Sequence, residues 1–598
     1  MTKELSVKIR GNPWPVLKLA SQPALVFVVI FVAIFLLHAP LLELPYFWDE
    51  AGYYIPAARD LLLTGSLIPH TTVSNAHPPL VMAWVALWWK VVGYAPLVTR
   101  SAMLVIAAFS LLGVFRLAQI VANTEVAIAS TICTAVYPVV FAQSSLAHVD
   151  LAAGGLTFWG LCAYLEDRPV ATAIWFSIAA LAKETAILVP VALVLWELFQ
   201  LVLPERGRAA LQGRVSGIES ERASAPATPA KRRILPLLMP ILPLALWYSY
   251  HFARTGYVFG NPEFFRYNVA DTLNPLRFFL ALALRLWQTF GYMHLWLLTA
   301  AMLLAMLLPP LKENSPARVG PGLRPGQGER SSPAERQRIP IPIQMVFLAI
   351  VKVYVIAMAL VGGAVLARYM LPAVPLVIIV AVSTLRRRLR YWVAAVAVIA
   401  ASFVAAWFWN PPYGFSPEDN LAYRDYIVLH QDAERFLEAR YPMAHVLTAW
   451  PASDELTRPW LGYVTRPVQV VRIEDFSLEQ MLSAADFRSH YEVALVFSTK
   501  IEPEHPLPDR WNSSLGRKWA DLKRRFFGFH RDLPPTAAAQ ILGGKIVFSE
   551  ERKGQWVAVI EMERGEIQNA TGVRREDFSL EQSRLGCQLE MAACRETR

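Results

Sequence analysis

Residues 24–50 read ALVFVVIFVAIFLLHAPLLELPYFWDE, an apolar run that ends in aromatic residues and two adjacent acids. Residues 24–42 contain no Asp, Glu, Lys or Arg, which is typical of a helix that crosses a lipid bilayer. The aromatic run that ends at Trp48 is typical of the boundary between lipid and water. Asp49 and Glu50 are therefore expected at the membrane surface, where ionisable residues commonly bind or react with something.

The composition indicates a polytopic α-helical membrane protein. The chain has 598 residues, of which 55% are hydrophobic and 17% charged, and its mean hydropathy is +0.36. Apolar stretches of membrane-spanning length recur along it. The net charge of +10 comes from basic residues gathered in a few loops between apolar stretches. This pattern sets orientation in a membrane and does not indicate a nucleic-acid partner.

We expect about eleven membrane-spanning helices and a cytoplasmic N-terminus, because four Lys and Arg residues precede residue 24. The stretch 80–94 is short and rich in Trp, so we expect it to lie in the membrane plane. With eleven spans, the basic segments 204–233, 309–338 and 386–390 all fall on the cytoplasmic side. The first two are rich in Pro, Gly, Ser and Ala, which predicts disorder. The expected spans are 24–42, 98–122, 126–146, 151–165, 170–182, 185–203, 234–250, 292–308, 344–361, 369–384 and 391–409.

From residue 410 the pattern changes to a small α/β domain, expected at 410–562. A helix signal at 418–440 precedes short apolar runs typical of strands. Eleven spans place this domain outside the cytoplasm, and we expect it to fold alone. The remaining residues, 563–598, are polar and predicted to be mobile. The expected strands are 445–450, 468–473, 492–497, 545–549 and 555–562.

The candidate catalytic residues are Asp49, Glu50 and Asp150, which this topology places on the extracytoplasmic face. Asp49 has an alternative role as a helix N-cap, and Asp150 could cap the span that follows it. Adjacent side chains diverge, so Glu50 is expected to support Asp49 and not to share its target. The other candidate site residues on this face are His77, Lys183, Arg368 and Tyr369. His77 could instead fix a turn. Lys183 and Arg368 could instead lie at helix ends and extend their charged groups toward water.

Several motifs in this order resemble those of the GT-C glycosyltransferases. Trp48-Asp49-Glu50 with the residues up to Gly65 is similar to the first extracytoplasmic loop of protein O-mannosyltransferases (family 39) and bacterial aminoarabinose transferases (family 83). The resemblance covers residues 24 to about 409, with His77 at a position that is often Lys in the second family. The other similar segments are 77–80 (HPPL), 144–150 (SSLAHVD), 181–184 (LAKE) and 367–372 (ARYMLP).

The resemblance implies a GT-C fold and a multi-pass enzyme of the bacterial inner membrane. Its donor would be a polyprenyl-phosphate sugar, and its acceptor a hydroxyl of a glycolipid, lipid A, a polymer or a protein. The donor phosphate would bind His77, Lys183, Arg368 and Tyr369. Asp49 would be the general base of an inverting transfer. The mixture of His and carboxylates leaves a divalent metal open, although no ligand spacing requires one. The alternative is a transporter or lipid flippase, which predicts charges near the middle of the bilayer.

Overall fold

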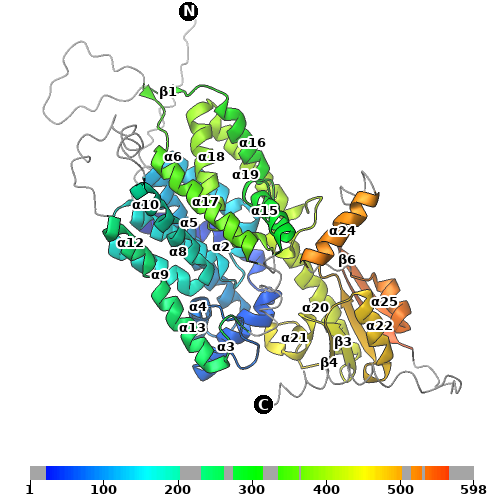
Figure 1. The fold of residues 1–598 in the computed structure, drawn as a ribbon. Helices are drawn as coiled ribbons and strands as arrows, with labels where there is room; N and C mark the ends of the chain where they lie inside the picture. The colour runs from blue at the N-terminus through cyan, green and yellow to red at the C-terminus, as the bar shows by residue number, and fades with distance from the viewer. Residues whose placement is uncertain are drawn as a thin grey trace, which may run out of the picture.

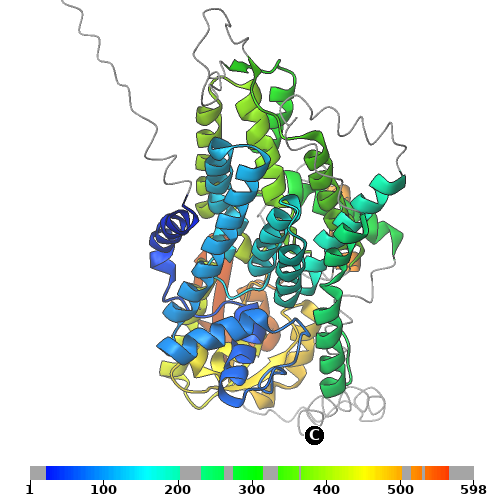
Figure 2. The same ribbon diagram turned by 90° about the vertical axis from the view of Figure 1, so that its left-hand side faces the viewer.

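The structure is a computed structural model that describes residues 22–202, 230–260, 274–313, 334–361, 365–501, 513–527 and 532–563. Most of the predicted loops 204–233 and 309–338 lies outside the described residues, as does nearly all of the predicted tail 563–598. A helical bundle fills one end of the molecule, and a sheet with its own helices lies at the other (Figure 1). In a view turned by 90°, the first helices of the chain lie beside the region that contains the sheet (Figure 2).

Five described helices are long and apolar enough to cross a membrane. A sixth span is formed if α15 (Pro275–Phe290) and α16 (Leu295–Met306), bent by 76° relative to each other, act as one. The polytopic helical class is therefore confirmed by length and composition, whereas the predicted number of eleven spans is not. The five helices are Pro23–Leu41, Pro96–Val121, Glu184–Val202, Arg233–Thr255 and Ile341–Leu360.

Proline residues explain two differences from the expected spans. The predicted span 126–146 is two helices, α6 (Thr124–Val136) and α7 (Pro138–Gln143), because Pro138 cannot continue the first helix. The predicted span 369–384 begins later, at α18 (Val374–Arg388), since Pro372 separates it from the turn at Ala367–Met370.

Helix α4 (Leu80–Val92) has 13 residues, so its length of roughly 20 Å is less than the thickness of a bilayer core.

Helix α15 was not expected, because Arg277 and Arg285 interrupt its apolar pattern. Both arginines are buried. The guanidinium of Arg285 donates hydrogen bonds to the carbonyl oxygens of Leu366 (2.8 Å) and Met358 (3.2 Å). Arg285 therefore fastens α15 to the segment that leads into Arg368.

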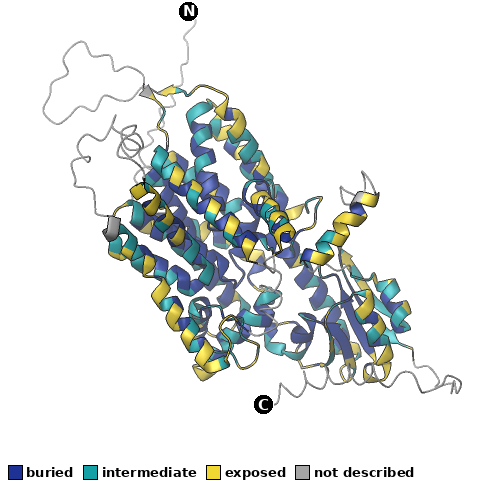
Figure 3. Cartoon of the chain, viewed as in Figure 1, coloured by how far each residue is buried: buried dark blue, intermediate teal, exposed yellow. Residues whose placement is uncertain are grey.

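The C-terminal region contains a five-stranded sheet, with strands close to their predicted positions. Its order is β4-β3-β5-β7-β6; the first three strands are parallel and β7 and β6 pair antiparallel. All five residues of β5 are buried, which indicates that both faces of the sheet are covered. The strands at the centre of the sheet are coloured as buried in Figure 3. Helix α20 (Ala422–Arg440) lies on one side, and α22 (Leu478–Asp486) and α25 (Pro535–Leu542) lie on the other (Figure 1). The strands are β3 (His445–Ala449), β4 (Gln469–Ile473), β5 (Val493–Phe497), β6 (Gly544–Arg552) and β7 (Gln555–Met562).

The core of this region is continuous with the loop after the first helix. Tyr46 and Phe47 belong to the same buried cluster as Tyr426 on α20 and Phe497 in β5. The ring of Phe47 meets the ring of Tyr426 edge-on, with centroids 5.2 Å apart. A fragment of residues 410–562 would expose this part of the core to water, which argues against the expectation that it folds alone.

Candidate active site

The backbone around Asp49 is shaped by an irregular turn. Trp48 has a φ of 45°, a left-handed conformation that is uncommon outside glycine. The π-helix Glu50–Tyr54 follows it, and short π-helical turns occur often at functional sites. Asp49 stands at the cap position of this turn, but its side chain makes no capping hydrogen bond. Asp150 lies inside the first turn of α8 (Asp150–Leu165), after the cap residue Val149. Neither aspartate therefore acts as a helix cap.

Glu50 is fully buried and bound by the protein. Its Oε1 accepts hydrogen bonds from Arg100 (2.6 Å) and from the backbone N–H of Ala147 (2.6 Å). Its Oε2 accepts one from the N–H of Phe47 (2.9 Å), and Arg100 also donates to the carbonyl of Pro45 (2.7 Å). The ion pair and the Ala147 hydrogen bond join the Asp49 loop to the turn before Asp150.

The replacement Arg100→Met tests this ion pair. It leaves the Glu50 carboxylate buried without its cation, so we expect a loss of about 3–5 kcal/mol in the free energy of unfolding. Glu50→Gln together with Arg100→Met should recover part of the loss. Denaturant unfolding in detergent measures both.

The matched control is Arg116→Met, which breaks an ion pair with Glu166 whose side chains are 44% and 28% exposed. It should change the free energy of unfolding by at most about 1 kcal/mol. A Glu50→Gln variant of normal stability that has lost its catalytic rate would instead make Glu50 a catalytic group.

Arg368 brings together three carboxylates that are distant in sequence. Its guanidinium hydrogen-bonds the carboxylates of Asp49 and Glu418. Its Nε lies 3.3 Å from Oδ2 of Asp150. The structure thus places two of the predicted catalytic residues, Asp49 and Asp150, on one predicted phosphate ligand, Arg368.

These carboxylates differ in access to solvent. The side chain of Asp49 is 21% exposed, whereas those of Asp150 and Glu418 are 4% and 3% exposed. A group that exchanges a proton with a bound substrate must be reachable, so Asp49 is the carboxylate of this cluster best placed to act as a base.

The remaining predicted ligands lie around the cluster. Nζ of Lys183 lies 2.5 Å from Oδ1 of Asp150 and 3.9 Å from the centre of the Tyr369 ring. Tyr369 thus holds the ammonium through its ring face. Nδ1 of His77 lies 2.8 Å from Oε2 of Glu184, and the two side chains are 13% and 28% exposed. His77 is therefore more accessible than Lys183 or Arg368.

Glu418 and His148 complete the cluster and were not predicted as site residues. Burial is the main cause that raises the pKa of Glu418 to about 8, with Arg368 opposing the shift and Asp49 adding to it. Burial, with Arg368 and Arg100 nearby, lowers the pKa of His148 well below its usual value. His148 lies inside a motif noted in the sequence. Glu418 begins a helical region, where an acid is common for local reasons, so no sequence signal distinguishes it.

Asp49, His148 and Glu418 are the described residues of this cluster that could hold a divalent ion. Each offers a ligand atom, and these atoms all lie within 4.8 Å of one another. Nε2 of His148 and Oε1 of Glu418 are buried without a hydrogen-bond partner. Arg368 already supplies positive charge to both carboxylates, so an ion there would have to displace its guanidinium.

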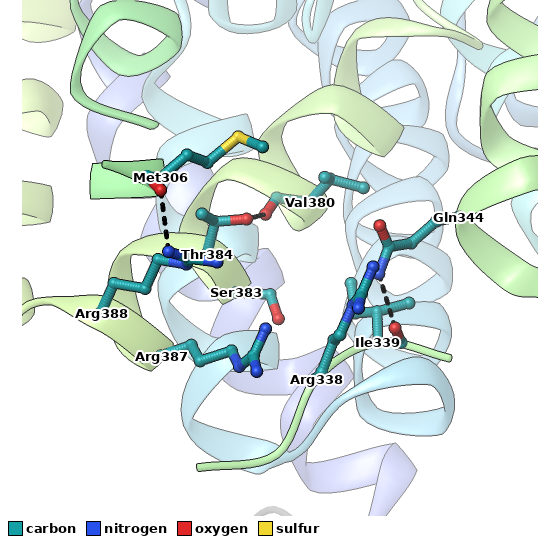
Figure 4. Close-up of a pocket in the computed structure, with 9 residues that line it drawn as sticks. All are labelled: Met306, Arg338, Ile339, Gln344, Val380, Ser383, Thr384, Arg387 and Arg388. Atoms are coloured by element: carbon teal, nitrogen blue, oxygen red, sulfur yellow. Dashed lines mark hydrogen bonds between the residues drawn. The ribbon is translucent and has the colours of Figure 1, made fainter. Parts of the chain in front are cut away.

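A small cavity of about 120 Å³ lies at the other end of α18. Arg338, Arg387 and Arg388 line it, and Arg388 donates to the carbonyl of Met306 at 2.8 Å (Figure 4). The lining residues on α18 run from Val380 to Arg388, toward the end of the helix that faces away from Arg368. The cavity is therefore distinct from the carboxylate cluster.

No protein-family model matches the sequence, and no curated protein sequence matches it significantly. Among solved structures, the chain is similar to ArnT from Cupriavidus metallidurans bound to undecaprenyl phosphate, with 13% identity, a TM-score of 0.47, and coverage of 90% of this chain and 97% of that one. It is also similar to the Archaeoglobus fulgidus oligosaccharyltransferase in complex with Zn and sulfate, with 12% identity, a TM-score of 0.43, and coverage of 89% and 72%. Both likenesses are distant, with TM-scores below 0.5.

Proposed function

We propose that the chain is an integral-membrane glycosyltransferase that moves a sugar from a polyprenyl phosphate to an extracytoplasmic hydroxyl. The observation that carries the proposal is Asp49, a partly exposed carboxylate held by Arg368 beside buried cations. It lies between aromatic residues that suit a lipid–water boundary. The acceptor is a glycolipid, lipid A, a polymer or a protein, and the membrane is the bacterial inner membrane.

In the proposed reaction, the acceptor oxygen attacks the anomeric carbon of the sugar. Asp49 takes the hydroxyl proton as general base while the new carbon–oxygen bond forms. The bond from the anomeric carbon to the phosphate oxygen breaks, and its electrons leave with the polyprenyl phosphate. One displacement inverts the anomeric centre. Asp150 keeps Lys183 and Arg368 in place.

The donor phosphate binds His77, Lys183, Arg368 and Tyr369 in this proposal. Cations near the leaving phosphate stabilise the charge that develops there. Lys183 and Arg368 are both bound to carboxylates, so the phosphate exchanges with a carboxylate partner when it binds. An entering phosphate meets His77 first, because His77 is more exposed than Lys183 and Arg368.

The rival function is a transporter or lipid flippase. It would place ionisable residues within broken helices near mid-bilayer. Arg368 and Lys183 instead lie in the turns beside the ends of α18 and α9 (Pro169–Ala182). That placement favours chemistry at the membrane surface.

A set of radiolabelled polyprenyl-phosphate sugars, each offered to the purified protein, tests the proposal and names the sugar. We expect one donor to release polyprenyl phosphate and transfer its label with inverted configuration. Movement of intact lipid across a liposome membrane, without cleavage of any donor, would favour the flippase.

Lys183→Ala should weaken binding of the donor. Loss of a charged hydrogen bond costs about 1.5–3 kcal/mol, which is roughly a 10- to 150-fold rise in Kd. Titration with polyprenyl phosphate, followed by tryptophan fluorescence, measures it. Lys90→Ala, on the exposed face of α4, is the matched control and should leave Kd unchanged. Equal affinities in the Lys183 variant and the wild type would remove Lys183 from the phosphate site.

A further inference from the structure

A second group of metal-ligating side chains lies inside the C-terminal region. His430 and Glu434 are one turn apart on α20, and Glu455 comes from α21 (Ala452–Thr457). One ligand atom from each lies within 4.8 Å of the others. Nδ1 of His430 is 2.6 Å from Oε2 of Glu455 and 3.7 Å from Oε1 of Glu434.

These side chains are buried but incompletely satisfied. Glu434 and Glu455 are 0% exposed and His430 is 1% exposed. With both glutamates ionised, both carboxylate oxygens of Glu434, Oε1 of Glu455 and Nε2 of His430 have no hydrogen-bond partner. Burial and the neighbouring Glu455 raise the pKa of Glu434 well above its usual range. Among the described residues, no Lys or Arg pairs with either glutamate. Two carboxylates buried without a cation are costly, and each such unsatisfied group requires an explanation.

We propose that His430, Glu434 and Glu455 bind a divalent transition-metal ion, with Zn²⁺ as the expected occupant. One doubly charged ion neutralises two carboxylates and gives the free oxygens of Glu434 a partner. One imidazole with carboxylates is a ligand set that zinc accepts, at bond lengths of about 2.0–2.2 Å. Tetrahedral ligands then lie roughly 3.3 Å apart, so small side-chain movements are enough.

The surroundings disfavour Mg²⁺ and Ca²⁺. These ions require six or more oxygen ligands, and Mg²⁺ usually keeps several waters. The ring of His430 lies between aromatic rings, with centroids 3.9 Å from Tyr426 and 4.5 Å from Phe497. Such a wall excludes a shell of waters and favours an ion with few ligands.

The site would also position the candidate active site. The ring of Tyr426 stacks on His430, and its centroid lies 5.5 Å from that of the Trp48 ring. Trp48 precedes Asp49. An ion that fixes His430 would therefore also restrict Tyr426 and Trp48 beside Asp49. The metal site itself does not depend on the proposed reaction.

Metal analysis of the full-length protein, purified in detergent without chelators, tests the inference. We expect about one zinc ion per chain, and loss of that ion in Glu434→Gln and in His430→Ala. His490→Ala, an exposed histidine of the same region, should keep it. His148→Ala should keep it too, which separates this site from the group around Asp49. Wild-type protein without bound transition metal, or unchanged zinc in both ligand variants, would overturn the inference.

A second measurement needs no variant, so it holds even if the substituted chains fail to fold. X-ray absorption of the zinc in wild-type protein should show one imidazole and otherwise oxygen ligands. Treatment with 1,10-phenanthroline should lower the Tm, added Zn²⁺ should restore it, and the non-chelating 1,7 isomer should do neither. Sulfur ligands or several imidazoles around the zinc would contradict the assignment.

Discussion

Asp49→Asn should lower the rate of sugar transfer by ~10²–10⁴-fold, the usual contribution of a general base. Asparagine keeps the size of the side chain and can still accept a hydrogen bond from Arg368. It cannot take the proton of the attacking hydroxyl. Folding and donor affinity should therefore change little. Single-turnover transfer with a saturating labelled donor measures the chemical step, and lipid-phosphate titration measures the affinity.

Glu43→Gln is the matched control, because Glu43 is an exposed carboxylate in the same loop. It should leave the rate of transfer unchanged. Near-normal single-turnover transfer by Asp49→Asn would end the assignment of Asp49 as a base. Asp150 and Glu418 would then be the carboxylates to test, although both are buried.

Arg368→Ala should affect both stability and rate. The replacement leaves the carboxylates of Asp49, Asp150 and Glu418 close together without their shared guanidinium. We expect a loss of about 3–5 kcal/mol in the free energy of unfolding, as for other broken buried ion pairs. Turnover should fall below that of Asp49→Asn, because the base loses its position and the phosphate loses a cation. Denaturant unfolding and single-turnover transfer measure the two effects.

Two further variants separate the effect of carboxylate repulsion on stability from the effect of Arg368 on the rate of transfer. Arg368→Met with Glu418→Gln removes a charge of each sign, so it should regain part of the stability but not the rate. Arg424→Ala, an exposed arginine on α20, should shift stability by about 0.5 kcal/mol or less. A fully stable Arg368→Ala protein would show that the cluster is not held by this residue.

The local features of the fold could be predicted from sequence because they depend on short periodic patterns. The five strands of the C-terminal sheet lie close to where alternation and turn residues placed them. The membrane spans were harder, because apolar runs do not show where proline ends a helix. Pro138 and Pro372 divide or delay two predicted spans. Helix α15 was not predicted because Arg277 and Arg285 interrupt its apolar pattern, although both side chains are buried and donate to backbone carbonyls.

The sequence indicated several residues of the cluster around Arg368 but not which of them pair. Motifs in order indicated Asp49, Asp150, Lys183 and Arg368, and the structure brings all four together. The ion pairs among these residues are set by the folded chain and cannot be derived from the order of the motifs. Lys183 and Arg368, expected to hold phosphate, bind carboxylates in the structure. Glu418 could not be predicted, because its role appears only when the C-terminal region docks on the first loop.

The contact between Asp49 and Arg368 joins residues 319 positions apart, and this separation has a consequence for biogenesis. At about 5–20 residues per second, a ribosome completes Arg368 roughly 15–60 s after Asp49. During that interval the loop that carries Asp49 has been synthesised without the guanidinium of Arg368 and without Glu418. The Asp49 carboxylate therefore lacks its cation until most of the helical region has been made, and the cluster can assemble only after residue 418 has been added.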